Sequence, residues 1–260
     1  MIFEEGKIRE LAPHVFLRPA VDNSLWADLG DGAVVVDGLE DAPLAPVIRD
    51  AVRQTTGQAI RWVVNTHWHR DHTACNPEWA REGATIIAHE SAAPATPARD
   101  GRPDVTFSDR YTLRGGARQV ELEWLGGAHT PEDSVVWLPR ARVLHVGDLF
   151  GWGLIPLRAI APESIARLRE VYARLLTYDA DVVVPGHGPT LTPAELRGFL
   201  VYFDDVVARV PALCRAGRTP AEVARAVPPP EDMRDWWRFA DWKHARNIEQ
   251  LCRAASALAE

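Results

Sequence analysis

Residues 66–72 read Thr-His-Trp-His-Arg-Asp-His and place four potential metal ligands within six residues. Neutral imidazole and carboxylate are preferred ligands of zinc and other borderline divalent ions. The apolar run just before this motif, Arg-Trp-Val-Val-Asn, indicates a buried strand. Because side chains alternate in an extended segment, His67 and His69 can converge on one ion. Asp71 and His72 follow where the chain is expected to turn, so we expect them to face a second ion nearby.

The rest of the chain predicts an α/β core followed by helices. The segment 24–38 reads as strand, glycine turn and β-branched strand, which is typical of a hairpin. Further strands are expected at 15–17, 60–64, 84–88, 111–113, 120–125, 135–138, 142–146 and 182–184, helices at 43–55, 76–82 and 163–176, and a long surface loop at 92–104. From Thr192 onward the pattern is helical only. We therefore predict a catalytic core over 1–190 and a helical C-terminal extension over 191–260 that packs on it.

Composition argues against several classes of function. The net charge is −7, and no basic tract is present to bind nucleic acid. No apolar run approaches the roughly 18 residues needed to span a bilayer, and the N-terminus lacks the features of a signal peptide. We expect a cytoplasmic protein with a small-molecule substrate and with no nucleic-acid or membrane partner. Homo-oligomerisation is left open.

The three cysteines show no paired or Cys-x-x-Cys spacing. They are Cys75, Cys214 and Cys252. The sequence therefore indicates neither a disulfide framework nor a cysteine-type zinc site.

Three more candidate ligands share the setting of the first cluster. His129, Asp148 and His187 each follow a predicted strand within a glycine-rich turn. Loops at strand ends can converge, and glycine lets the backbone approach a ligand shell. Taken singly, each is more simply a packing, solvent or turn residue; together with residues 67–72 they indicate one metal centre. The other histidines, His14, His89, His145 and His244, are interpreted as structural, with His145 in the core or behind the ligands.

The full set of motifs resembles the metallo-β-lactamase-fold hydrolase superfamily, over roughly residues 14–190. Besides the ligands, the motifs are Val-Asp-Gly at 36–38 and Pro-Gly-His-Gly at 185–188. The resemblance implies a four-layer αβ/βα sandwich with the metal site along one edge between two sheets. It also implies that His67, His69 and His129 hold the first metal, that Asp71, His72 and His187 hold the second, and that Asp148 bridges the two. For Asp37 it implies a structural role or one behind the ligands.

The resemblance also suggests a reaction. It implies two divalent ions, with zinc as the first expectation and iron or manganese as alternatives. A metal-bridging hydroxide would cleave a small ester, thioester or lactone, and Asp71 would accept or relay a proton as well as bind metal. The bridging Asp148 matches the glyoxalase II-like (hydroxyacylglutathione hydrolase-like) branch and counts against a dedicated β-lactamase. The alternatives are β-lactam hydrolysis or an iron-dependent redox enzyme similar to persulfide dioxygenases. Trp68, Phe150 and Trp152 are expected to form an aromatic wall of the pocket.

Overall fold

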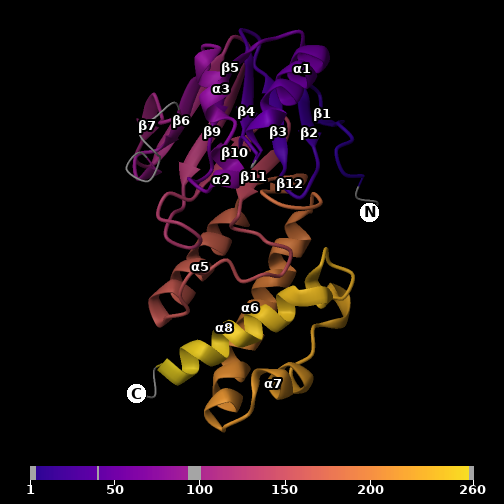
Figure 1. The fold of residues 1–260 in the computed structure, drawn as a ribbon, viewed down its shortest axis with the longest axis vertical. Helices are drawn as coiled ribbons and strands as arrows, with labels where there is room; N and C mark the ends of the chain where they lie inside the picture. The colour runs from indigo at the N-terminus through magenta and orange to yellow at the C-terminus, as the bar shows by residue number, and fades with distance from the viewer. Residues whose placement is uncertain (1–3, 40, 93–100, 258–260) are drawn as a thin grey trace. The chain divides into compact units, whose positions relative to one another are not determined.

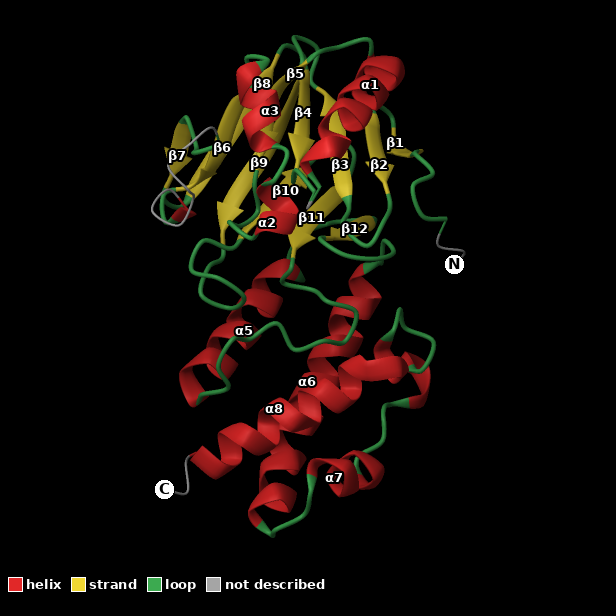
Figure 2. Cartoon of the chain, in the orientation of Figure 1, coloured by secondary structure: helices red, strands yellow, loops and turns green. Residues whose placement is uncertain are grey.

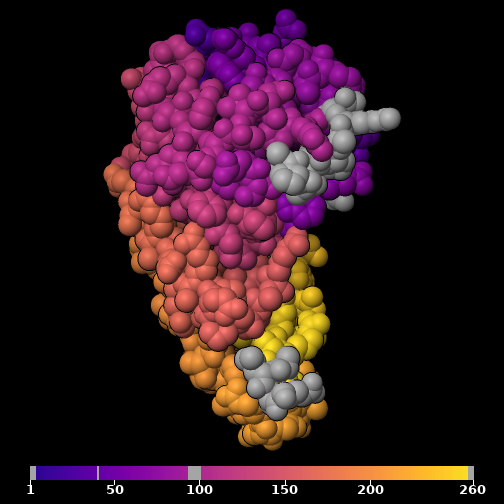
Figure 3. All heavy atoms as spheres, turned by 90° about the vertical axis from the view of Figure 1, so that its left-hand side faces the viewer, coloured from indigo at the N-terminus to yellow at the C-terminus, as the bar shows by residue number. Residues whose placement is uncertain are grey.

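The computed structural model describes residues 4–39, 41–92 and 101–257; the remaining residues are grey in Figure 3. The chain divides into two compact units. Unit 1 comprises Met1–Leu149 and Asp179–Leu191, and unit 2 comprises Phe150–Tyr178 and Thr192–Glu260. The predicted division differs in one segment, because Phe150–Tyr178 groups with the C-terminal helices.

Unit 1 is built on two β-sheets (Figures 1 and 2). The first has seven strands in sequence order: β1 (Arg9–Ala12), β2 (Val15–Arg18), β3 (Ser24–Asp28), β4 (Ala33–Val36), β5 (Ile60–Val64), β6 (Thr85–His89) and β7 (Val105–Phe107). Strands β1 to β4 pair antiparallel, and β4 to β7 pair parallel. The connections between the parallel strands contain η1 (Ala42–Leu44), α1 (Ala45–Thr56), α2 (Arg70–Thr73) and α3 (Asn76–Arg81).

The second sheet has five strands in the order β12-β11-β10-β9-β8. They are β8 (Arg110–Gly115), β9 (Arg118–Trp124), β10 (Ser134–Leu138), β11 (Val143–Gly147) and β12 (Val182–Pro185). Strands β8 to β11 pair antiparallel, whereas β11 and β12 are parallel. Strands β9, β11 and β12 therefore point the same way, and their carboxyl ends meet at one edge of the sheet.

Two apolar clusters hold these layers together. Alternate residues of the first sheet, such as Val34, Val36 and Val64, pack against Leu122 and Val136 of the second sheet. The intervening residues face the opposite side and pack against α1 and α3. These are Trp26, Val35, Val63 and Ile86 from the strands, with Ile48, Val52 and Trp79 from the helices. Period-two alternation thus gives central strands such as β3 and β4 two buried faces, and unit 1 holds one helical layer and both sheets of the predicted sandwich.

Unit 2 is helical. Its helices are α5 (Pro162–Leu175), α6 (Pro193–Arg215), α7 (Pro220–Ala226) and α8 (His244–Ala257), with the short η2 (Glu231–Met233) and η3 (Phe239–Lys243) before α8. Thr192 and Thr219 cap α6 and α7 through capping boxes. Tyr172 of α5 meets Phe199 of α6 with ring centroids 5.0 Å apart. This packing of α5 on α6 explains why residues before position 179 group with the C-terminal helices.

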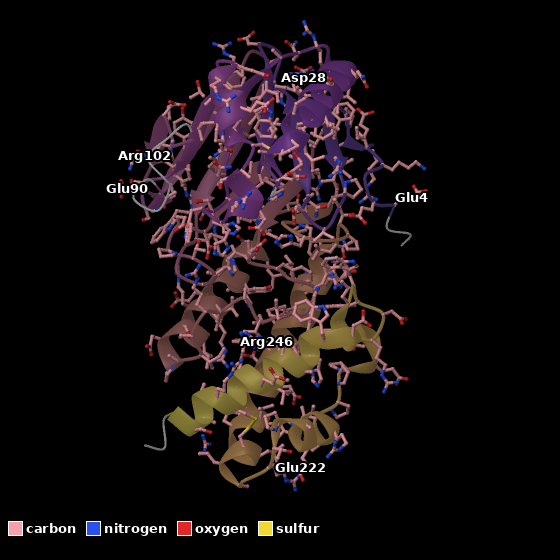
Figure 4. All side chains as sticks on the ribbon, in the orientation of Figure 1. Glu4, Asp28, Glu90, Arg102, Glu222 and Arg246 are labelled. Atoms are coloured by element: carbon pink, nitrogen blue, oxygen red, sulfur yellow. A yellow bond between two sulfur atoms is a disulfide. The ribbon has the colours of Figure 1, made fainter. Side chains whose placement is uncertain are left out.

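A disulfide joins Cys214 of α6 to Cys252 of α8 (Figure 4). The prediction that no disulfide is present was therefore wrong. The two cysteines are 38 residues apart in sequence, and only the packing of α6 on α8 brings their Cα atoms to 5.3 Å. Cys75 is a free, buried thiol.

Most of the predicted elements are present. The hairpin of β3 and β4 is confirmed, and so is the helical character of the chain after Thr192. The sequence did not predict β1, β7 or α2, which have only 4, 3 and 4 residues. Most of the predicted loop 92–104 lies outside the described residues. None of the helices in the described parts of the chain is both long and apolar enough to cross a membrane.

Candidate metal centre

The histidine motif changes from extended to helical backbone in its middle. His67 follows β5, and His69 still has extended backbone, with φ −59° and ψ 147°. Helix α2 begins at Arg70, and the His72 N–H donates to the His69 carbonyl at 3.0 Å. Because a helix rotates each residue by about 100°, the later ligands turn away from the direction of the earlier ones. The local backbone therefore divides the motif into two pairs of ligands.

The first pair, His67 and His69, converges with His129, which lies in the loop between β9 and β10. His67 Nε2 is 3.0 Å from His69 Nδ1, and His129 Nε2 is 3.1 Å from the same atom. Tetrahedral zinc with ligands at about 2.0–2.1 Å would set neighbouring nitrogens about 3.3 Å apart. The three imidazoles thus converge at close to the spacing of one coordination shell.

The second pair, Asp71 and His72, converges with His187, which follows β12. His187 Nε2 is 3.2 Å from Asp71 Oδ2, and His72 Nε2 is 3.6 Å from that oxygen. Asp148, after β11, lies between the two groups. Its Oδ2 is 3.5 Å from His129 Nε2 and 3.2 Å from His187 Nε2, while its Oδ1 is 3.4 Å from His72 Nε2.

The structure therefore brings all seven predicted residues together. They form two groups that share Asp148: His67, His69, His129 and Asp148, and Asp71, His72, Asp148 and His187, with the ligand atoms of each group within 4.8 Å of one another. Two atoms of the second group, His72 Nε2 and Asp148 Oδ1, are buried and have no hydrogen-bond partner among the described residues. Gly186 leaves this space open, because an added Cβ would overlap Asp148 Oδ1 and lie 2.7 Å from His72 Cε1. The donor types and the two orphaned atoms fit divalent ions.

The outward ring nitrogens are held by partners behind the ligands. His72 Nδ1 lies 2.8 Å from Asp37 Oδ2, and His67 Nδ1 lies 3.1 Å from Thr66 Oγ1. Asp37 also accepts from the Thr66 N–H and hydroxyl, both at 2.9 Å. His187 Nδ1 lies 2.9 Å from the Val21 carbonyl and 3.1 Å from Asp22 Oδ1. Such contacts fix the tautomer and the ring orientation of a metal-binding histidine, and they give Asp37 the role behind the ligands that was expected of it.

Two acidic residues shape the loops that carry His129 and Trp68. Asp133 accepts from the His129 N–H at 2.7 Å and from the N–H and hydroxyl of Thr130 at 2.8 and 2.6 Å. Glu132 accepts from the Trp68 N–H at 3.1 Å. Sequence reasoning missed both residues, together with Asp22 and Thr66. The sequence Pro131-Glu132-Asp133 is typical of a turn. Its closeness to His129 in the sequence was the only indication that Glu132 and Asp133 support the site.

The charges of the site are strongly coupled. Burial disfavours the charge on His72, but the carboxylates of Asp148 and Asp37 outweigh it and raise the pKa of His72 well above its usual value. Burial likewise opposes the charge on His187, whose pKa Asp148 raises to about 11. Burial, aided by His72, lowers the pKa of His67 well below its usual value. Without metal, protons therefore reside on the second group, and ions that bind there must displace them.

The remaining candidates are not members of the two groups. His145 is fully buried; its Nδ1 accepts from the Gly147 N–H at 3.2 Å, and burial lowers its pKa to about 4. This agrees with its interpretation as a core residue. Trp68 packs beside His69 with ring centroids 5.1 Å apart. Phe150 and Trp152 belong to unit 2, where both contact Trp236, so their place in a substrate pocket stays a prediction.

Comparison with known proteins gives the family. The 2,4-dinitroanisole O-demethylase subunit alpha of Nocardioides sp. (strain JS1661) is 25% identical over 219 residues, which cover 82% of this chain and 64% of that protein. A hydroxyacylglutathione hydrolase of Anaeromyxobacter dehalogenans (strain 2CP-C) is 35% identical over 129 residues, covering 49% of this chain and 45% of that protein. The chain thus matches less than two thirds of the length of either relative.

A solved structure agrees with the sequence relatives. A metallo-beta-lactamase from Pontibacter korlensis aligns with a TM-score of 0.68 and 25% identity, covering 76% of this chain and 98% of that one. The sequence profile of the Metallo-beta-lactamase superfamily matches residues 18–187, the span that carries every candidate ligand described above. This protein therefore belongs to the metallo-β-lactamase superfamily, and its α/β fold is the fold of that family.

Proposed function

We propose that this protein is a dinuclear metal-dependent hydrolase that cleaves a small ester, thioester or lactone. The observation that carries the proposal is the pair of ligand groups joined by Asp148, because a shared carboxylate suits two neighbouring ions. When bound, two such ions would lower the pKa of a water molecule and polarise the carbonyl of the substrate. Zinc is the metal that we propose first, since its ligands are commonly imidazole and carboxylate.

The residues of the chain have distinct tasks in this scheme. His67, His69 and His129 hold the first position, and Asp71, His72 and His187 hold the second. Asp71 is the most exposed ligand of the second group, with 30% of its side chain accessible. We assign it the acceptance of a proton at Oδ2 in addition to binding metal. No serine or cysteine nucleophile is then required.

The names of the relatives do not identify the substrate of this protein. Their names include an O-demethylase subunit, a hydroxyacylglutathione hydrolase and metallo-beta-lactamases, which act on different bonds. Fold and metal site are shared across such reactions, so the substrate has to be found by assay. We retain thioester, lactone and ester as the proposed class on the basis of the bridging Asp148.

The test combines metal analysis with a substrate panel. Protein purified with zinc, iron or manganese is analysed for bound metal and then assayed with thioesters, lactones, esters and β-lactams, with and without chelation. We expect two ions per chain and turnover that chelation abolishes and metal restores. Asp148→Asn should lower kcat at least about 100-fold, since it removes a charged ligand of both ions. Asp109→Asn, an exposed change in unit 1, is the control. A single redox-active iron together with oxygen consumption would favour the persulfide-dioxygenase-like alternative, and preferential cleavage of β-lactams would favour a lactamase.

A further inference from the structure

A cavity of about 410 Å³ lies beside the second ligand group, within unit 1. Small-molecule sites are commonly about 300–1,000 Å³ in volume. The cavity borders the outer side of the second ligand group, because Asp22 lines the cavity and contacts the outward Nδ1 of His187 at 3.1 Å. Arg70 lines it as well, and this residue lies in sequence between the ligands His69 and Asp71. A substrate held at the second group would reach this cavity past Arg70, which adjoins the part-exposed Asp71 in sequence.

Two guanidinium groups line the cavity. Arg18 ends β2 and is half-buried, and Arg70 begins α2 and is exposed. Glu5 and Asp41 line the same cavity, yet among the described residues neither arginine has a carboxylate within the 4.0 Å ion-pair distance. Elsewhere in unit 1, by contrast, Arg118 pairs with Asp28 at 3.0 Å. The two donors in the cavity thus remain available to a ligand.

We propose that this cavity is a subsite for a carboxylate on the non-reacting part of the substrate. This assignment rests on the proposed hydrolase function. Guanidinium groups bind carboxylates through paired, charge-assisted hydrogen bonds. Leu39 and Leu44 also line the cavity and can pack against a methylene spacer. Three carboxylates also line the cavity: Asp22 is engaged by His187, and Glu5 and Asp41 would repel a second negative charge, which favours a carboxylate over a phosphate dianion.

The first test compares three esters that differ only at the far end of the acyl chain. They are p-nitrophenyl hexanoate, mono-p-nitrophenyl adipate and p-nitrophenyl 6-(trimethylammonio)hexanoate, each corrected for spontaneous hydrolysis. We expect the highest kcat/KM for the adipate ester. Arg18→Gln and Arg70→Gln should each lower the ratio of kcat/KM for adipate over hexanoate by at least about tenfold. Arg114→Gln, an exposed arginine that lines a separate cavity, should leave the ratio unchanged.

The second test needs no turnover. Metal-free protein is titrated with hexanoate or with hexanamide while its Tm is followed, because a ligand that binds only the folded state raises Tm. Hexanoate should raise Tm in wild type and in Arg114→Gln, and less in Arg18→Gln and Arg70→Gln. Hexanamide should have little effect on any of them.

The outcomes separate the two proposals. If no ester, thioester or lactone is cleaved with any metal, the hydrolase proposal fails and the Tm titration still decides the subsite. If esters are cleaved but both arginine variants keep the wild-type selectivity and Tm response, the subsite assignment alone is overturned. Preference for the cationic ester would overturn it too, because Glu5 and Asp41 would then be the recognition groups.

Discussion

Asp37→Asn tests how the chain controls the tautomer of a metal ligand. Asp37 is fully buried and accepts three hydrogen bonds. Its Oδ1 receives the Thr66 N–H at 2.9 Å, and its Oδ2 faces the Thr66 hydroxyl at 2.9 Å and His72 Nδ1 at 2.8 Å. Asparagine keeps the shape of the side chain but offers only one acceptor oxygen with two N–H donors. The substitution therefore changes the chemistry while leaving the packing in place.

The orientation of the new amide is determined by its surroundings. Its oxygen must face the Thr66 N–H, because two opposed donors in a buried position would cost about 1–3 kcal/mol. Its NH₂ group then meets the Thr66 hydroxyl and His72 Nδ1, and both can accept. His72 must in consequence carry its proton on Nε2, the atom that faces Asp148 and Asp71. A protonated nitrogen cannot bind metal, so the second position loses a ligand.

The substitution should weaken both metal binding and the metal-free fold. Changes to the partners behind metal ligands typically weaken metal binding about 10–100-fold, or about 1.4–2.8 kcal/mol. The free energy of unfolding without metal should fall by about 1–3 kcal/mol, because the protonated His72 then either faces a second donor or gives up the Nδ1 proton that Asp37 helps to hold. Competition with a chromophoric chelator measures the first quantity and urea unfolding of the metal-free protein the second, with Asp109→Asn as control. Binding of both ions with wild-type affinity in Asp37→Asn would refute this account of the His72 tautomer.

Two further predictions concern unit 2. The Cys214–Cys252 bond closes a loop of 38 residues, so Cys252→Ser should lower the free energy of unfolding by about 4 kcal/mol on the chain-entropy estimate. Urea unfolding with and without reductant measures this, and a reductant effect that persists in Cys252→Ser would contradict it. Burial lowers the pKa of Lys243 to about 7, against about 10.4 in an unfolded chain. The unfolded state then binds more protons between about pH 7 and 10.4, so stability should rise with pH there by up to about 1.4 kcal/mol per unit. Lys243→Met should flatten this rise in urea unfolding at several pH values, and an equal slope in both proteins would exclude the lysine as its source.

The sequence predicted those parts of the fold that local pattern determines. The hairpin of β3 and β4 follows from β-branched residues around a glycine turn, and α1 follows from apolar spacing that ends at Gly57, which has φ 71°. Strands β1 and β7 are too short to produce a periodic pattern, and their pairing depends on neighbours already in place. The grouping of α5 with α6 likewise depends on tertiary packing, which sequence spacing does not record.

Some residues of the candidate site could likewise be predicted from the sequence, whereas others could not. The seven residues in its two groups could be named because imidazoles and carboxylates at strand ends in glycine-rich turns are unusual in combination. Asp22 and Asp133 could not be named, because a single aspartate in a turn is common and their contacts with His187 and His129 arise only after folding. The Cys214–Cys252 bond was missed because it links two helices whose contact has no sequence signature.

The distribution of the ligands over both sheets has a consequence for how unit 1 matures. His67 and Asp71 follow β5 of the first sheet, whereas Asp148 and His187 follow β11 and β12 of the second. Neither sheet alone carries a full ligand group, so strong capture of ions must await the docking of the two sheets through their apolar faces. In small zinc domains, by contrast, metal and fold arrive together. In unit 1 the order would be reversed, with the two sheets docking first and the ions binding afterwards.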